Sequence, residues 1–245
     1  MPALELNNLS KSFGGLHVIS DVSFKVMEGE RRLILGPNGA GKTTLFNLIS
    51  GDLAPSGGTI LLAGEDVSAL PTNRRAARGI GRTFQILTLF GGETVLRNVV
   101  LASLGRTSKR WKPFGSLDAD NEFRTSAMKI LRTVMLDHIA DKCVSETSYG
   151  ERRRLEIAMA LAQQPRLLLL DEPLAGLSKE ERKGVERLLN DLPRSLTVIM
   201  IEHDMDVALG FADRIALLQN GKLIVDGSRD EVIADPRTKE AYLAE

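Results

Sequence analysis

The feature that most constrains this chain is a glycine-rich stretch, LILGPNGAGKTTL, at residues 33–45. It predicts a buried strand, a loop and the first turn of a helix, and residues 36–43 match the phosphate-binding pattern G-x-x-x-x-G-K-[ST]. Glycines let main-chain N–H groups turn toward an anion, and the helix start adds unpaired donors and a positive dipole end. Lys42 supplies a charge for the outer phosphates, and the Thr43 hydroxyl suits magnesium. The stretch predicts a nucleotide site, the alternative being a glycine-rich turn without a ligand.

The hydrophobic pattern predicts an α/β fold. Residues 167–170 and 196–201 are apolar throughout, which is typical of parallel strands buried on both faces. Residues 4–9 and 22–26 alternate between apolar and polar, which favours an antiparallel hairpin. Helical spacing over 94–104 and 120–136 indicates a helical lobe in the middle of the chain.

Local signals place the ends of several elements. Ser148, Ser178 and Ser228 each precede a glutamate by three residues, the spacing of a capping box at a helix start. The dipeptide Asn220-Gly221 lies between two apolar runs and predicts a tight hairpin turn. Shorter segments predict strands at 31–35, 59–62 and 79–84 and a helix at 71–78.

Composition limits the possible partners. The 245 residues are 43% hydrophobic and 26% charged, and the formal net charge is +0, so a nucleic-acid partner is not expected. The start does not resemble a secretory signal, and no apolar run approaches the ~20 residues of a spanning helix. The single cysteine, Cys143, excludes an internal disulfide and fits a reducing compartment. We therefore expect a protein inside the cell that reaches a membrane only through a partner.

An acidic pair follows the apolar strand 167–170. Ligands of open α/β sheets bind at the carboxyl ends of strands, where Asp171 suits magnesium and Glu172 suits polarising a water molecule. Pro173 predicts an extended Glu172, with the two carboxylates pointing in different directions. The alternative is a pair of exposed acids at a strand end.

With these motifs the chain resembles the nucleotide-binding subunit of an ATP-binding-cassette (ABC) transporter. The matching motifs run in order through nearly the whole length: the Walker A loop 36–43, Gln85 of the Q-loop, the signature 148–151, the Walker B strand 167–171, the D-loop 175–178 and the switch residue His203. The resemblance implies a P-loop core with a mostly parallel central sheet, a small antiparallel β subdomain and an α-helical subdomain. Residues 1–85 and 165–245 would form the nucleotide-binding core, and 86–164 the helical subdomain.

The resemblance also implies site residues for ATP and Mg²⁺. Nucleotide ligands would be Phe13, stacking on adenine, with Gly36, Pro37, Asn38, Gly39, Ala40, Gly41, Lys42, Thr43, Thr44, Ser148 and Gly150. Metal ligands would be Thr43, Gln85 and Asp171, and catalytic residues Glu172, His203 and Gln85. Ser148 and Gly150 would act across a head-to-tail dimer. Two alternatives are that Ser148 only caps its own helix and that His203 is a hydrogen-bonded histidine after a core strand.

Some signature and D-loop positions depart from the commonest pattern. Thr147, Tyr149 and Glu151 stand where Leu, Gly and Gln are usual, and Ser178 replaces Asp at the end of the D-loop. Because Ser148 and Gly150 are kept, the resemblance still implies that ATP is held between two subunits.

Several local choices, among them Arg82-Thr83-Phe84-Gln85 and Glu202-His203-Asp204-Met205, resemble the ATPases of branched-chain amino-acid uptake and their urea and amide relatives. The resemblance implies a second ATPase subunit, membrane permease subunits and, indirectly, a substrate-binding protein, with this chain peripheral on the cytoplasmic face of the inner membrane. The alternatives are a soluble ABC ATPase, a small-molecule kinase and an ATPase for another cargo such as lipopolysaccharide.

Three further segments have no predicted role in nucleotide binding. Residues 109–112 predict a solvated loop rather than a lipid or partner contact, and the arginines 152–154 predict a solvated helix face. Leu87, Leu89 and Phe90 either meet a membrane subunit's coupling helix or fill the core of the helical lobe.

Overall fold

A computed structural model describes residues 1–83, 88–105, 121–202 and 210–243. The chain divides into two compact units, each of which is described by itself. The first consists of Met1–Arg82, Arg166–Glu172 and Pro193–Glu245, and the second of Thr83–Pro165 and Pro173–Leu192. Residues 173–192, which the sequence division assigned to the nucleotide-binding core, group with the second unit.

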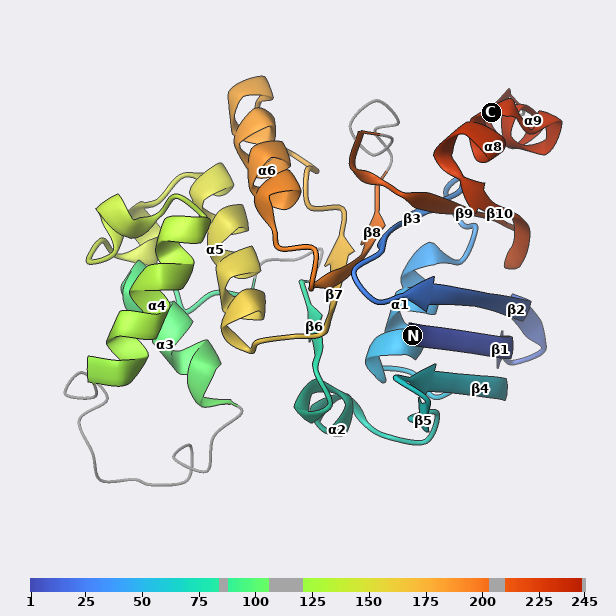
Figure 1. The fold of residues 1–245 in the computed structure, drawn as a ribbon, viewed down its shortest axis with the longest axis horizontal. Coiled ribbons are helices and arrows are strands. Elements are labelled where there is room, and N and C mark those ends of the chain that lie inside the picture. Colours follow the sequence, from blue (N-terminus) through green and yellow to red (C-terminus); the bar gives the residue numbers. More distant parts are fainter. Residues whose placement is uncertain (84–87, 106–120, 203–209, 244–245) are drawn as a thin grey trace. The chain divides into compact units, whose positions relative to one another are not determined.

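The first unit contains a four-stranded antiparallel sheet with the order β2-β1-β4-β5 (Figure 1). Its strands are β1 (Pro2–Phe13), β2 (Leu16–Met27), β4 (Gly57–Leu62) and β5 (Glu65–Asp66). Leu4 and Leu6 alternate on one face of β1 and are buried, and Leu9 is buried with them because the pairing with β2 is irregular between Leu6 and Leu9. The predicted hairpin is confirmed, because β1 and β2 pair antiparallel.

A six-stranded sheet with the order β10-β9-β3-β8-β7-β6 forms the rest of the framework. Its strands are β3 (Arg31–Leu35), β6 (Ile80–Arg82), β7 (Leu167–Asp171), β8 (Thr197–Ile201), β9 (Arg214–Gln219) and β10 (Lys222–Ser228). Neighbours from β9 to β6 pair parallel, and only β9 and β10 pair antiparallel. Every residue of β3, β7 and β8 is buried, which confirms the predicted central strands.

Helix α1 (Lys42–Ser50) contributes to the core shared by the two sheets of the first unit. Leu45 and Phe46 are fully buried in this core, and Gly51 ends the helix in the left-handed conformation. The other helices of the unit are α2 (Thr72–Ala77), α8 (Arg229–Ala234) and α9 (Pro236–Leu243).

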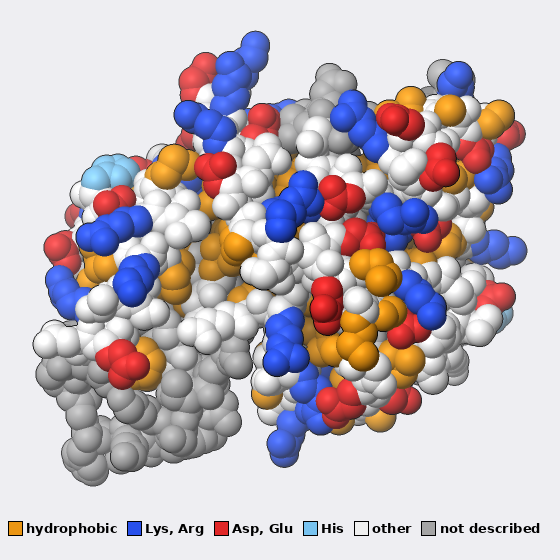
Figure 2. Space-filling view, viewed as in Figure 1, with side chains coloured by type: hydrophobic (Ala, Val, Ile, Leu, Met, Phe, Trp, Pro, Cys, Tyr) orange, Lys and Arg blue, Asp and Glu red, His pale blue; other side chains and the backbone are white. Residues whose placement is uncertain are grey.

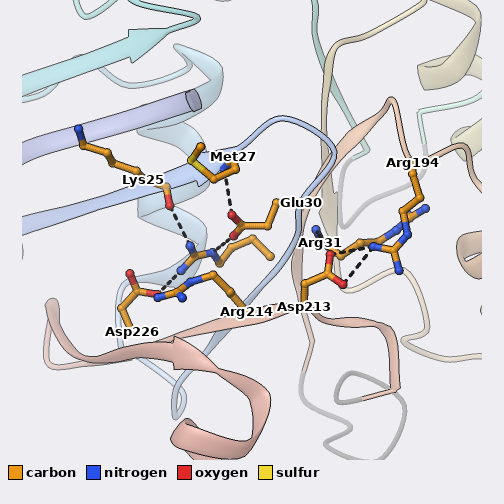
Figure 3. Close-up of polar contacts among 9 residues, drawn as sticks. Lys25, Met27, Glu30, Arg31, Arg194, Asp213, Arg214 and Asp226 are labelled. Carbon is orange, nitrogen blue, oxygen red and sulfur yellow. Dashed lines mark hydrogen bonds and ion pairs between the residues drawn. The ribbon is translucent and has the colours of Figure 1, made fainter. Parts of the chain in front are cut away.

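A buried ion-pair cluster holds β3, the strand that leads into the phosphate loop (Figure 3). The Arg32 side chain is 1% exposed and donates from Nε to Glu30 Oε1 at 2.7 Å. It also pairs with Asp226 on β10 and donates to the carbonyl of Lys25 on β2 at 2.8 Å. Its guanidinium lies 5.4 Å from the Phe24 ring centroid. One side chain therefore ties β3 to a strand of each sheet.

The second unit is mainly helical, as predicted for the middle of the chain. It contains α3 (Val95–Leu104), α4 (Asn121–Thr133), α5 (Tyr149–Ala162) and α6 (Lys179–Asp191). The capping boxes at Ser148, Ser178 and Ser228, the last in the first unit, are all present. Within the described ranges, no helix combines the length and hydrophobicity that crossing a bilayer requires.

Candidate functional site

The glycine-rich loop joins β3 to α1, and its backbone admits only glycine at two positions. Gly36 has φ +152°, and a Cβ there would lie 2.2 Å from the carbonyl oxygen of Leu218. Gly41 has φ +99° at the N-cap of α1, where a Cβ would lie 2.9 Å from the Val18 carbonyl oxygen. A Cβ at Gly41 would also lie 2.8 Å from the Ile19 side chain, but both positions clash with a main-chain oxygen, so moving a side chain alone relieves neither clash.

The hairpin turn between β9 and β10 supports this loop. Gly221 donates its N–H to the carbonyl of Ala40 at 3.0 Å and accepts from the N–H of Ser20 at 2.8 Å. Ala40 itself donates to the Pro37 carbonyl at 3.2 Å, which closes the turn. The sequence predicted the Asn220-Gly221 turn but gave no sign that it holds the loop.

Lys42 lies over the loop that precedes it. Its side chain is largely buried, and Nζ donates to the carbonyls of Gly36 at 2.6 Å and Pro37 at 2.9 Å. Asn38, Gly39 and Thr43 are exposed, and Thr44 is half-buried. The ammonium group is therefore held at the loop beside residues that solvent reaches.

The predicted acidic pair lies at the carboxyl end of β7. Asp171 is 2% exposed, and its Oδ2 accepts a hydrogen bond from Arg82 at 3.2 Å. Glu172 is half-buried, and its N–H donates to the Ile201 carbonyl at 3.0 Å, which continues the contact between β7 and β8 by one residue.

The predicted extended conformation of Glu172 is wrong, since its φ is +47°. The chain keeps the bond to Ile201 and must then turn sharply into Pro173. A left-handed conformation is uncommon for a residue with a side chain, and such residues cluster at functional sites.

The N-terminus of α5 carries the signature residues. Ser148 Oγ accepts from the Glu151 N–H at 3.2 Å, while Glu151 Oε2 accepts from the Ser148 N–H at 2.7 Å. This confirms that Ser148 caps its own helix. The Gly150 N–H donates to Oε1 of Glu181 on α6 at 3.0 Å. Hydrogen bonds from the main-chain N–H and hydroxyl of Ser178, together with the bond from the Gly150 N–H, lower the pKa of Glu181.

The prediction that the arginines at 152–154 form a solvated face is wrong for Arg153. Its side chain is buried, pairs with Glu156 at 2.7 Å and donates to the Pro173 carbonyl at 3.2 Å. Arg154 donates to the carbonyls of Val134 and Met135. Arg152 donates to the Ser145 carbonyl at 3.0 Å, so all three arginines make hydrogen bonds within the second unit.

The structure describes only some of the other predicted residues. Phe13, at the end of β1, is 45% exposed, with the Lys11 ammonium 5.0 Å from its ring centroid. Leu89 is half-buried, and Phe90 is 53% exposed. Gln85, His203, Leu87 and the loop at 109–112 lie outside the described residues.

The donor set suits a magnesium ion. Asp171 offers a carboxylate and Thr43 a hydroxyl, which are the hard oxygen ligands that Mg²⁺ prefers, and phosphates usually complete such sites. The described residues contain no group of three or more His, Cys, Asp or Glu that could hold a metal ion. Charges of both signs are interspersed on the described surface in Figure 2, so no broad basic field is visible on that face.

A glycine-rich loop between a parallel strand and a helix, with an acidic pair at the end of another strand of the same sheet, defines a P-loop nucleotide-binding protein. Residues 19–175 match the family described as "ABC transporter". The chain belongs to this family as one of its ATPase cassettes, which confirms the predicted family and fold class.

The chain is similar along its whole length to characterised transport proteins. It is 38% identical to the high-affinity branched-chain amino acid transport ATP-binding protein LivG of Salmonella typhimurium, covering 100% of this chain and 98% of that protein. It is 37% identical to the lipopolysaccharide export system ATP-binding protein LptB of Haemophilus influenzae, with the same coverage.

Solved structures give the same assignment. The ADP conformation of MJ1267, an ATP-binding cassette of an ABC transporter, has a TM-score of 0.88 and 31% identity and covers 100% of both chains. The dimeric post-hydrolysis state of the cassette MJ0796, bound to ADP and Pi, has a TM-score of 0.79 and 27% identity over 92% of this chain and 98% of that one.

Proposed function

We propose that this chain binds and hydrolyses ATP to drive the import of branched-chain amino acids through separate membrane subunits. The observation that carries the proposal is the glycine-only loop at the end of β3, with Lys42 held over it and an acidic pair on β7. Full-length similarity to LivG supports the choice of cargo. We place the chain on the cytoplasmic face of the membrane, held there by the permease subunits.

The loop residues would bind the phosphates. The main-chain N–H groups of Asn38, Gly39 and Gly41 and of the first turn of α1 would face the phosphate oxygens. The Lys42 ammonium would exchange its bonds to the Gly36 and Pro37 carbonyls for bonds to the outer phosphates. The exposed ring of Phe13 would stack on adenine.

Thr43, Asp171 and Gln85 would hold Mg²⁺. The ion supplies charge stabilisation for the phosphates as the bond to the γ-phosphate breaks. The protein supplies position, because Thr43 lies in the first turn of α1 and Asp171 is buried at a strand end. Positioning and electrostatic stabilisation are the main contributions to catalysis of phosphoryl transfer.

Glu172 would orient and deprotonate the attacking water, with His203 and Gln85 near the γ-phosphate. Asp171 is buried and bonded to Arg82, whereas Glu172 is half-buried in a left-handed backbone, so the two carboxylates stand in different surroundings and would take separate roles. Replacing Glu172 by glutamine should keep ATP binding and reduce steady-state hydrolysis at least ~10²-fold, the usual contribution of a general base. Unchanged phosphate release in that variant would remove Glu172 from the mechanism.

Two subunits would enclose each nucleotide. Ser148 and the N–H of Gly150 would meet the γ-phosphate held by the partner's loop, and that N–H would exchange the Glu181 carboxylate for a phosphate oxygen. We also propose that residues 1–85 and 165–245 act as the nucleotide-binding core and 86–164 as the helical subdomain. Glu172→Gln protein that stays monomeric with ATP, alone and with its membrane partner, would refute this arrangement.

Lipopolysaccharide export is the second candidate, because LptB is almost as similar to this chain as LivG is. Membrane subunits that co-purify with the chain from native membranes would decide between the two cargoes. Recovery with ribosomes or DNA instead would favour a soluble ABC ATPase. The kinase alternative has no support from the family match.

A further inference from the structure

Arg82 contacts the Walker B aspartate and the Walker A helix at once. It is the last residue of β6, and its side chain is 8% exposed. Nη2 donates to Asp171 Oδ2 at 3.2 Å. Nη1 donates to Asn47 Oδ1 at 2.7 Å, Ser50 Oγ at 2.9 Å and Asp52 Oδ2 at 2.9 Å. All five residues belong to the first unit, so the network lies within one compact unit.

The bond to Arg82 orients the Asp171 carboxylate. A buried carboxylate needs a charged or hydrogen-bonding partner, and Asp171 is 2% exposed. A guanidinium has a rigid, planar array of donors, so it restricts the rotation of a carboxylate that it contacts. Because the carboxylate has two oxygens with several lone pairs, it can keep this bond at Oδ2 and still coordinate a cation.

The bonds from Nη1 fix the same guanidinium to α1. Asn47 lies on this helix and Ser50 ends it, while Lys42 and Thr43 form its first turn. Since a helix of this length is stiff, holding its C-terminal half against Asp171 also sets the position of the Thr43 hydroxyl relative to that carboxylate. These two groups are the metal ligands proposed above.

We propose that Arg82 is a positioning residue for the magnesium ion, one that orients Asp171 and aligns it with Thr43. The inference rests on the proposed ATP and Mg²⁺ site but concerns a residue that touches neither ligand. The competing explanation is that Arg82 only stabilises the end of α1.

Arg75 provides a matched control for that explanation. It is also a buried arginine, and from α2 it donates to two carbonyls at the end of α1, those of Leu48 at 2.5 Å and Ile49 at 2.9 Å. Its other hydrogen bonds go to the carbonyls of Leu70 and Ser68. Arg75 therefore shares the stabilising role of Arg82 without its contact to Asp171.

The test measures how magnesium changes nucleotide binding in the Arg82→Lys, Arg82→Met and Arg75→Lys proteins. Full-length protein is titrated with a fluorescent ATP analogue in EDTA and at a series of Mg²⁺ concentrations. Loss of an outer partner of a metal ligand typically weakens metal affinity ~10–100-fold. We expect the Mg²⁺ concentration for half-maximal effect to rise at least ~10-fold in both Arg82 variants, with affinity in EDTA unchanged. Arg75→Lys should lower the melting temperature and leave the Mg²⁺ dependence as in wild type.

Three results would overturn the inference. An Mg²⁺ dependence within about two-fold of wild type in both Arg82 variants would show that Asp171 needs no orientation by Arg82. An equal change in Arg75→Lys would assign the effect to the stability of α1. Wild-type protein that binds no nucleotide would refute the proposed function as well, which distinguishes the two failures.

Discussion

Replacing Arg32 by methionine should destabilise the first unit strongly, because it leaves a buried carboxylate without its cation. The Arg32 side chain is 1% exposed and that of Glu30 is 7% exposed, whereas Asp226 at 24% can recover hydration. Removing one partner of a buried ion pair costs ~3–5 kcal/mol. Glu30 would keep its hydrogen bond from the Met27 N–H at 2.9 Å, so we expect the lower end, about 3 kcal/mol in the free energy of unfolding.

Native-state hydrogen exchange of the slowest amides in β2 and β3 is the suitable assay, because two units need not unfold in one transition. Arg78→Met is the control, since Arg78 pairs with Glu65 in the same unit at an exposed site, where an ion pair contributes little to stability. Adding Glu30→Gln to Arg32→Met should restore part of the loss by removing the buried charge. A loss for Arg32→Met no larger than that of Arg78→Met would refute the reasoning.

Three further predictions concern the site and its supports. Native-state hydrogen exchange should show that Glu181→Ala destabilises α6 more than Glu231→Ala destabilises α8, because each glutamate caps its own helix but only Glu181 also accepts from the Gly150 N–H. Hydrogen bonds from its own N-cap serine hold the pKa of Glu181 below the ordinary value, so this stabilisation is present above ~pH 4.3 and should decline as pH falls through the lowered pKa. Gly41→Ala should weaken ATP binding at least ~10-fold in an equilibrium titration, since a Cβ there meets the backbone; affinity equal to wild type would contradict the loop geometry. Lys42→Ala should also bind nucleotide more weakly, and an unchanged dissociation constant would remove its ammonium from the phosphate site.

The framework could be predicted because its signals are local and repeated. Apolar runs predicted β7 and β8, alternation predicted β1 and β2, and each capping-box serine predicted a helix start. The conformation of Glu172 could not be predicted in this way. The rule for a residue before proline is local, whereas the bond to Ile201 that sets this backbone comes from a neighbouring strand.

The arginines at 152–154 show why a charge run is a weak guide to exposure on a helix. Successive residues of a helix are ~100° apart, so three in a row span too much of its circumference to share one face when another side is packed. Arg153 takes the inward direction, where Glu156, one turn later, offers a buried partner at 2.7 Å. The pairing could have been suspected from the i, i+3 spacing, but its burial could not.

In the candidate site, too, one group of residues could be predicted from the sequence and another could not. Contiguous motifs predicted the loop and the acidic pair, because their chemistry needs neighbouring residues. The supports come from distant segments: Arg82 is 89 residues from Asp171, and Glu181 is 31 residues from Gly150. No pattern within one segment of sequence reports such contacts.

Two of the donors proposed to bind phosphate already make hydrogen bonds within the protein, and this lowers the expected affinity for nucleotide. In this structure the Lys42 ammonium is bonded to loop carbonyls, and the Gly150 N–H is bonded to the Glu181 carboxylate. A phosphate that binds these donors must replace hydrogen bonds that the protein already makes. Each new contact therefore contributes only the difference in free energy between the new hydrogen bond and the one it replaces. The affinity of one subunit for ATP should therefore be well below the sum of its contacts. In the proposed dimer, the exchange at Gly150 would occur only when a second subunit brings its γ-phosphate, so closure would depend on the bound nucleotide.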